Sequence, residues 1–447
     1  MENLNYQDND TNMEINEDVD ESSDLEFDSD DEYGGAHIPT LDNKVYQKLK
    51  QNDPSVSDLH IPLNCTYGEP FFNSIDWKED GDCVSDNAHL KMIRITCHGC
   101  PAYAGQQYVL GEESLNSGLL PTKQQLQEVF LCIYRNSFLK ELAFSSIEIN
   151  DEFGGGIIEG LSGHRSLEKL HVSNGLLGGM ACKAIGNILT HPTSKLKDLD
   201  LLNCYLDNKN FGILCDALSG NSTMKRLNLT RNNRITSAGW QSLSALLQHP
   251  NCKLAKLSLK STDLYDDSIA ILGSSIGNSS LRALDLSFNR NISREGWQRL
   301  INQLSQNINI MSLGLIENSI DDLSVAALAN IGNLKFLDLS FCNFFTPMGW
   351  WPFFNALQRR GIQLTKLDIS GTNIGNEGAA ALGSLLSNMS SLRTLQMSNM
   401  SISGHNFTSQ RWQTLFTTLL DSNLDLVKLH LGGNQIDDEG IRLLALS

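Results

Sequence analysis

Residues 196–204 have the sequence Leu196-Lys197-Asp198-Leu199-Asp200-Leu201-Leu202-Asn203-Cys204, with leucine at positions 1, 4 and 6 of the segment. The 447-residue chain repeats this pattern along its length. The segments begin at Val56, Leu90, Leu139, Leu167, Leu196, Met224, Leu254, Leu281, Ile310, Leu334, Leu364, Leu392 and Leu426. From Leu139 onward the starts lie 24 to 34 residues apart. Such a period predicts an array of one structural unit, each copy packing on its neighbours.

Within each segment, positions 4 to 6 alternate apolar, polar and apolar, as expected for a short strand with one buried face. Position 9 carries a small polar residue in most copies, which we expect to hydrogen-bond to the backbone where the strand turns away. These residues are Asn64, Cys204, Asn232, Thr262, Asn289, Asn318, Cys342, Thr372 and Asn434. Three copies have Ile147, Gly175 and Met400 instead, so this ladder is predicted to be incomplete.

Between the strands the apolar spacing is helical. Trp240, Leu243 and Leu247 stand at i, i+3 and i+7, which predicts one buried stripe on an amphipathic helix. Similar stripes begin at Trp297, Trp350 and Trp412, whereas the intervening helices have smaller residues, as in residues 378–386. We therefore predict two alternating kinds of unit, with the tryptophans in the core rather than exposed as ligand anchors.

Strand-plus-helix units of 28–29 residues in two alternating types resemble the ribonuclease-inhibitor family of leucine-rich-repeat proteins. The resemblance covers residues 56–447. It implies an α/β horseshoe solenoid with parallel strands on the concave face and helices on the convex face. The family's architecture serves ribonuclease inhibitors, Ran GTPase-activating proteins and sensor domains of innate immune receptors, so it is specific for fold and weakly specific for function.

The ends of the chain differ from the array. Residues 1–33 contain 14 Asp and Glu and no Lys or Arg, within a total formal charge of −18, and we expect an acidic disordered tail. Residues 34–55 are predicted to form an N-terminal cap containing a helix. The solenoid of about 13 repeats then covers 56–447, with insertions near 64–89 and 99–138. We expect a C-terminal helix from Asp437 that leaves one edge poorly shielded, giving a monomer or weak self-association through that end.

No motif for catalysis, a metal or a cofactor is complete. Cys97-His98-Gly99-Cys100 is the only C-x-x-C, and a zinc site would need a second pair. The run Gly154-Gly155-Gly156 lacks the lysine of a phosphate-binding loop. The pairs Asp321-Asp322 and Asp437-Asp438 stand at predicted helix starts, where they cap free N–H groups. We therefore predict no enzymatic activity, no cofactor and no metal.

Composition also bears on partners and location. The net charge of −18 and the absence of a large basic patch oppose nucleic-acid binding. No run approaches the roughly 20 apolar residues of a membrane span, and the first residues lack a secretory signal. Ten cysteines without framework spacing suggest reduced thiols. We expect an intracellular protein, cytoplasmic or nuclear, with no membrane partner.

Positions 3, 5 and 7 of each segment should point away from the core, with position 8 at the rim. Four basic residues on two adjacent repeats form a local cluster: Arg226, Arg231, Lys256 and Lys260. Phe288, Phe336 and Phe341 fall at predicted exposed or rim positions. Exposed aromatic residues beside charge are typical of binding hot spots, so we predict that these seven residues bind a partner. The alternative is that a phenylalanine at position 8 folds inward beneath the following loop.

We predict a non-catalytic scaffold that binds a protein partner of unknown identity on the concave face. The alternative is a GTPase-activating protein, because the acidic segment and the repeats resemble Ran GTPase activators. In those proteins, however, the acidic segment follows the repeats, and their catalytic-loop residues cannot be placed on this chain.

The acidic tail has two interpretations. Ser23 and Ser29 each have a glutamate three residues later, the spacing that acid-directed kinases use, which makes them candidate phosphorylation sites. The alternative is a solvating extension that discourages self-association.

Overall fold

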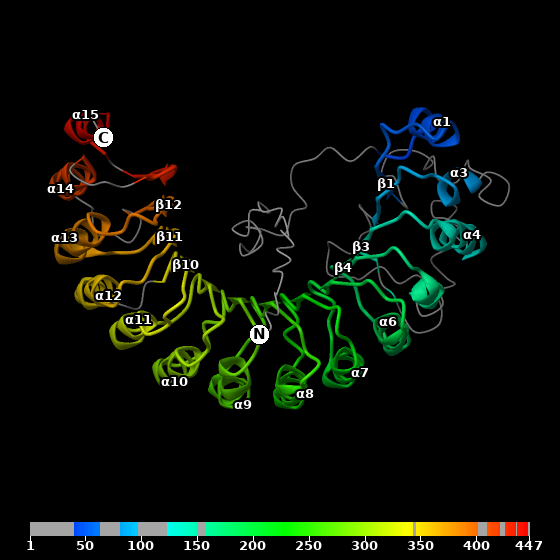
Figure 1. Ribbon diagram of the computed structural model, residues 1–447, viewed down its shortest axis with the longest axis horizontal. Helices are drawn as coiled ribbons and strands as arrows, with labels where there is room; N and C mark the ends of the chain where they lie inside the picture. The colour runs from blue at the N-terminus through cyan, green and yellow to red at the C-terminus, as the bar shows by residue number, and fades with distance from the viewer. Residues whose placement is uncertain are drawn as a thin grey trace, which may run out of the picture.

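The computed structural model describes residues 40–62, 81–96, 123–147, 149, 158–342, 346–400, 409–420, 425–434 and 436–445. These residues form an open horseshoe with the strands on the inner, concave side and the helices on the outer, convex side (Figure 1). Thirteen parallel strands make one sheet in chain order, from β1 to β13. The predicted α/β horseshoe, with one strand for each repeated segment, is confirmed.

The strands shorten after the fourth repeat, from five residues to three. Their bounds are β1 Asp58–Pro62, β2 Met92–Thr96, β3 Glu141–Ser145, β4 Lys169–Ser173, β5 Asp198–Asp200, β6 Arg226–Asn228, β7 Lys256–Ser258, β8 Ala283–Asp285, β9 Ser312–Gly314, β10 Phe336–Asp338, β11 Lys366–Asp368, β12 Thr394–Gln396 and β13 Lys428–His430.

A helix precedes β1, and helices follow the strands on the convex side (Figure 1). Their bounds are α1 Asn43–Lys50, α3 Asp82–Ser85, α4 Lys123–Arg135, η5 (a 3₁₀ helix) Gly160–Gly163, α6 Gly179–Thr190, α7 Asn208–Ser219, α8 Ser237–Gln248, α9 Asp266–Gly277, α10 Arg294–Leu304, α11 Asp322–Leu328, α12 Pro347–Arg360, α13 Gly375–Leu386, α14 Ser409–Leu420 and α15 Asp438–Leu444.

Several sequence predictions concern residues outside these ranges. They are the acidic segment 1–33 with Ser23 and Ser29, the ladder residue Asn64, the Cys97–Cys100 motif and the Gly154–Gly156 run.

The core is a continuous apolar layer between the sheet and the helices. Leu196, Leu199 and Leu201, at positions 1, 4 and 6 of their segment, are fully buried, and the repeats from β1 to β12 match them. In the last repeat Leu426, Leu429 and Leu431 are only partly buried. The tryptophans that begin the helical stripes are buried as well: Trp240, Trp297, Trp350 and Trp412. Their predicted place in the core is therefore confirmed.

Position 9 forms the predicted hydrogen-bond ladder. The Asn289 side-chain amide donates from Nδ2 to the carbonyls of Leu259 and Leu286, at 2.8 and 2.9 Å. Its Oδ1 accepts from the backbone N–H groups of Thr262 and Leu264, both at 3.2 Å. One amide thus satisfies four backbone groups from two repeats. Asn232, Asn318 and Asn434 make equivalent bonds to carbonyls.

Position 8, which comes just before this ladder, has a left-handed backbone in every repeat from β3 to β13, with φ between 52° and 68°. Its N–H donates to the position-7 carbonyl of the next repeat, as from Phe288 to Ile316 at 2.8 Å. This bond extends the backbone pairing beyond the three-residue strands. Several repeats have Asn or Gly at position 8, which adopt this conformation readily: Asn174, Asn203, Gly371, Asn399 and Gly433.

The alternation of two units has a physical reason at the helix starts. Asp266, the first residue of α9, accepts hydrogen bonds from the Ser293 N–H and Oγ at the start of α10, at 2.8 and 2.6 Å. A Cβ on Gly296 would overlap that carboxylate, so glycine is required before Trp297. Asp322, the first residue of α11, accepts equivalent hydrogen bonds from the Thr346 N–H and Oγ1 at the start of α12. A Cβ on Gly349 would overlap the Asp322 carboxylate.

Helix capping by the paired aspartates is also confirmed. Asp321 caps α11 by accepting from the Ser324 N–H at 2.9 Å, and Asp437 caps α15 by accepting from Gly440 at 2.8 Å. In the last repeat, within the described residues, Val427 next to β13 is 70% exposed and Ile441 on α15 is 55% exposed. This is the poorly shielded edge that the sequence predicts; self-association through it stays a prediction.

We predict that Asn289→Ala destabilises the array by about 3 kcal/mol. The substitution leaves four backbone groups without partners, and each such buried group costs about 1–3 kcal/mol unless water reaches it. Urea unfolding followed by circular dichroism would measure the loss. Asn302→Ala is the matched control, because Asn302 is exposed on α10 and should unfold at the same or slightly higher denaturant concentration. Equal midpoints for the two variants would contradict the ladder's role.

Candidate protein-binding surface

The concave face presents one row of side chains for each outward position of the repeat. The position-5 residues are all in register across the thirteen strands, as expected. The row is His60, Arg94, Ala143, His171, Asp200, Asn228, Ser258, Asp285, Gly314, Asp338, Asp368, Gln396 and His430.

The acidic members of this row have a structural task. Asp285 accepts from the Ser287 N–H at 2.9 Å, Asp338 from Ser340 at 2.9 Å and Asp368 from Ser370 at 2.8 Å. The carboxylate at position 5 therefore holds the backbone of position 7, where each strand ends. This explains why Asp and Asn recur at position 5 in the middle and C-terminal repeats.

Asp338 and Asp368 also face one another on neighbouring strands. Burial raises the pKa of both carboxyl groups, and the negative charge of Asp368 raises that of Asp338 further. Two carboxyl groups thus lie together on the concave face at β10 and β11, and a cationic group placed there would favour their charged forms.

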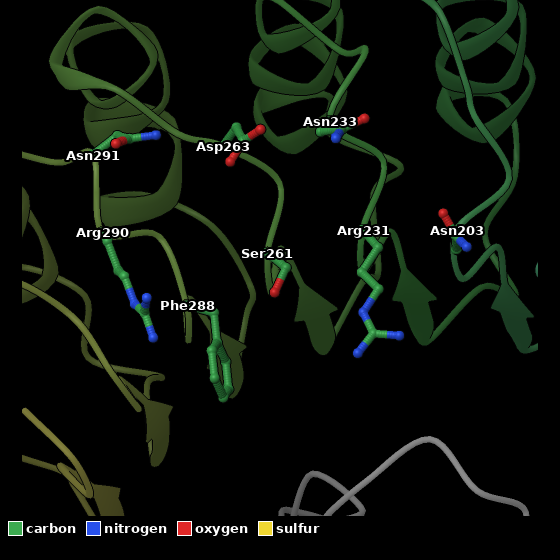
Figure 2. Close-up of a pocket in the computed structure, with 8 residues that line it drawn as sticks. All are labelled: Asn203, Arg231, Asn233, Ser261, Asp263, Phe288, Arg290 and Asn291. Atoms are coloured by element: carbon green, nitrogen blue, oxygen red, sulfur yellow. The ribbon is translucent and has the colours of Figure 1, made fainter. Parts of the chain in front are cut away.

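A different surface lies at the rim after β6, β7 and β8. It is an open pocket of about 550 Å³, lined by Asn203, Arg231, Asn233, Ser261, Asp263, Phe288, Arg290 and Asn291. Figure 2 shows the side chains of Arg231, Phe288 and Arg290 extending in the same direction, away from the helices. Asn233, Asp263 and Asn291 lie nearer the helices (Figure 2). We call Arg231, Lys260, Phe288, Arg290 and this pocket the rim site.

The rim site combines an aromatic ring with positive charge. The Lys260 ammonium lies 5.4 Å from the centroid of the Phe288 ring. Arg290 forms an ion pair with Glu317, yet its side chain remains 66% exposed. Arg231 is exposed and, among the described residues, has no carboxylate within ion-pair distance. Cations thus lie on both sides of a half-buried phenyl ring.

The other two predicted basic residues lie on the strands beside this site. Arg226 on β6 is half-buried and bonds to Asp198 at 3.2 Å, and Lys256 occupies the same register position on β7. The structure therefore places five of the seven predicted residues in two groups: Arg226 and Lys256 in register on β6 and β7, and Arg231, Lys260 and Phe288 at the rim site.

The two remaining phenylalanines belong to β10 and its loop. Phe341 is 37% exposed and lies over Gly371 of the next repeat, where a Cβ would overlap its ring. Neither Phe341 nor Phe288 is part of the apolar core, so the inward-folded alternative does not apply to them. The expectation of an exposed ring at Phe336 was wrong. It is only 7% exposed, because it lies on β10 between the side chains of β9 and β11.

A buried charge network lies further toward the N-terminus. His171 on β4 lies between Glu141 on β3 and Asp200 on β5, at 3.4 and 3.6 Å. Burial opposes protonation of His171, but the two carboxylates outweigh it and raise its pKa to about 9. In turn, His171 and Lys169 outweigh the burial of Glu141 and hold its pKa at about 2.

Sequence reasoning missed Arg290 and the amides of the pocket. Arg290 follows Asn289, which is position 9, so it lies outside the nine-residue segment from which the surface residues are predicted. The sequence does carry one signal for the residues at the rim. Asn, Gly and Ser recur at position 8, whereas four repeats have a larger residue there: Arg231, Phe288, Glu317 and Phe341.

The described parts of the chain contain no group of three or more His, Cys, Asp or Glu side chains suited to hold a metal ion. Within the same ranges, no helix combines the length and apolar character needed to cross a membrane. Burial raises the thiol pKa of several described cysteines: Cys132, Cys204, Cys215 and Cys342.

Comparison with known proteins agrees with this geometry. A family model described as Leucine Rich repeat matches residues 220–244, 277–300, 363–383 and 422–445. The chain is 29% identical to human (Homo sapiens) NACHT, LRR and PYD domains-containing protein 13 over 64% of this chain and 24% of that protein. It is also 29% identical to the ribonuclease inhibitor of Mus musculus, over 63% of this chain and 55% of the inhibitor. A chain from the crystal structure of the yeast Rad7 and Elc1 complex aligns over 88% of this chain and 81% of that chain, with 15% identity and a TM-score of 0.47.

The chain thus carries leucine-rich repeats in a solenoid and is similar to ribonuclease inhibitors and to NACHT, LRR and PYD domains-containing proteins. Leucine-rich-repeat proteins generally mediate protein–protein interaction, and ribonuclease-inhibitor-like families are typically non-catalytic binding scaffolds. The aligned part spans about a quarter of the NACHT protein and about half of the inhibitor.

We predict that His171 makes folding stability depend on pH. Its folded-state pKa lies above the ordinary value of 6.5, so its contribution is complete below pH 6.5 and is lost as pH rises through about 9. The loss should be about 2–3 kcal/mol. Unfolding curves at pH 6.5, 8 and 10 for the native chain and His171→Gln would measure it. If the difference between the two proteins were the same at every pH, the assigned charge state would be wrong.

Proposed function

We propose that this chain is a non-catalytic scaffold that binds a protein partner on its concave face and the adjoining rim. One observation carries the proposal. Bulky side chains stand at position 8, where the left-handed backbone favours glycine or asparagine, at Arg231, Phe288 and Phe341.

The conformational free-energy cost at position 8 supports a role for these side chains in binding rather than in folding. A left-handed conformation costs a non-glycine residue about 1–2 kcal/mol, and a short Asn side chain relieves part of this. At Asn174, Asn203 and Asn399 the chain uses that solution. At Phe288 and Phe341 it accepts the strain and leaves apolar rings outside the core. Aromatic rings held rigidly at a rim are suited to anchor a partner, because little entropy is lost when they are buried.

The charge distribution supports a partner of defined polarity. The surface is basic around β6 to β8, through Arg231, Lys260 and Arg290, and acidic at β10 and β11, through Asp338 and Asp368. A partner that spans both would present acidic groups to the first region and basic groups to the second. Such complementarity fixes orientation and speeds association.

The relatives and the cysteines support the remaining parts of the proposal. One relative is named ribonuclease inhibitor, and the ribonuclease in that name is itself a protein. The free thiols of Cys204, Cys215, Cys252 and Cys342 favour an intracellular location, cytoplasmic or nuclear, since thiols persist in a reducing compartment. Neither membrane nor nucleic acid is part of the proposed interaction.

We predict that Phe288→Asn lowers partner affinity about tenfold or more, as expected when a hot-spot side chain is removed. Phe341→Asn should have a similar effect, and both variants should fold as stably as the native chain, because Asn fits the left-handed backbone. The measurement is affinity capture with the full chain, followed by titration calorimetry with the captured partner.

The matched control is Ser146→Asn, which introduces the same residue at position 8 of the β3 repeat, outside the proposed surface. Undiminished affinity in both well-folded phenylalanine variants would reject the proposed surface. The alternative activity has a separate readout: GTP hydrolysis by a panel of small GTPases, which a binding scaffold should not accelerate.

A further inference from the structure

We propose that the rim site also binds the chain's own acidic segment, centred on residues 24–28, in competition with the partner. The competition part rests on the proposed function, whereas the contact itself does not. Residues 24–28 lie outside the described residues, so the argument uses their sequence alone together with the geometry of the rim site.

The segment matches the site in chemistry. Asp24-Leu25-Glu26-Phe27-Asp28 alternates carboxylates with apolar side chains. The rim site alternates in the same way, with the phenyl ring of Phe288 between Arg290 of its own repeat and the cations of the preceding repeats, Lys260 and Arg231. Leu25 and Phe27 can cover the exposed part of that ring while the carboxylates bind Arg231, Lys260 and Arg290. Charge-assisted bonds from arginine to carboxylate are among the stronger polar contacts in proteins.

The pocket also has the size and polarity for a peptide segment. Its volume of about 550 Å³ lies within the range of small-ligand sites, and it is open rather than enclosed. Asn203, Asn233 and Asn291 line it, and their amides can both donate to and accept from an extended backbone.

The length of the intervening chain permits the contact. The described chain begins at Thr40, which is bridged to His60 of β1 at the edge of the sheet. From β1 to β8, which Phe288 and Arg290 follow, there are seven strand spacings, or about 34 Å at roughly 4.8 Å each. The 12 residue-to-residue steps from Asp28 to Thr40 span up to about 40 Å when extended. A tether of that length gives an effective concentration in the millimolar range, so weak pairwise contacts suffice.

Elsewhere the described concave surface is unfavourable for this segment. At β10 and β11 the neighbouring Asp338 and Asp368 oppose the binding of a further carboxylate, whereas at β3 to β5 the charge of His171 is already taken up by Glu141 and Asp200. The strip at β6 to β8 is where positive charge outweighs negative charge beside an exposed aromatic ring. Phosphorylation of Ser23 or Ser29 would strengthen the contact by adding about −1.5 to −2 charges at each site.

The test is site-specific photocrosslinking in the full-length chain. Phe27 is replaced by p-benzoylphenylalanine, the purified protein is irradiated at low concentration, and the crosslinked peptides are identified by mass spectrometry. We expect intramolecular crosslinks to the loops that follow β5 to β8, with a yield that does not change on dilution. The yield should fall about fivefold or more in 0.5 M NaCl, where exposed charges are screened.

Two sets of substitutions make the result specific. Arg231→Glu with Arg290→Glu should abolish the crosslink, and the milder Arg231→Gln with Arg290→Gln should weaken it if the first pair impairs folding. Arg359→Glu with Arg360→Glu removes the same charge from exposed positions on α12, on the convex side, and should leave the crosslink intact. Crosslinks to other repeats, or a yield unaffected by the rim-site substitutions, would overturn the proposal.

Competition is measured separately. Asp24→Asn, Glu26→Gln and Asp28→Asn in the full chain should remove the crosslink and raise partner affinity severalfold. Loss of partner binding in Phe288→Asn without any crosslink would keep the proposed function and reject the intramolecular contact. A specific crosslink with partner binding insensitive to Phe288→Asn would do the reverse.

Discussion

Most strands of this solenoid are only three residues long, so the backbone of each repeat depends on hydrogen bonds made after the strand has ended. Position 8 turns left-handed and donates its N–H to the next repeat, and the position-9 side chain satisfies backbone groups from two repeats. Buried backbone groups without partners are costly, so this turn is the constraint on which the continuous sheet depends. The same turn places the position-8 side chain at the rim, in a fixed direction, in every described repeat from β3 onward.

This constraint leaves the position-8 side chains at the rim available for binding. Because the backbone there is held by bonds that do not involve the position-8 side chain, that side chain can vary from Gly to Phe without changing the array. The concave face is less free, since Asp285, Asp338 and Asp368 bind backbone N–H groups as well as facing outward. Charge on the concave face is therefore partly a by-product of folding, whereas the aromatic and basic residues of the rim are not.

Much of the fold follows from spacing in the sequence. The thirteen segments, their common register, the buried tryptophans and the asparagine ladder all depend on contacts between residues at fixed separations, which a repeat makes visible. Part of the site follows for the same reason, since Phe288 and Lys260 stand at defined positions of adjacent repeats. Phe336 was misjudged because exposure on a curved inner face depends on the size of the neighbouring side chains, and spacing carries no such information.

The sequence by itself determined the periodic order: which residues face the core, which face outward, and that the strands follow one another in a single parallel sheet. Only the tertiary structure decided which outward residues meet. It placed Arg290 beside Phe288 and put His171 between two carboxylates from different strands. The physical reason is that burial against a common core is fixed by the period of the chain, whereas contact between side chains of neighbouring repeats depends on curvature, rotamer and the left-handed turn, which are set when the repeats stack.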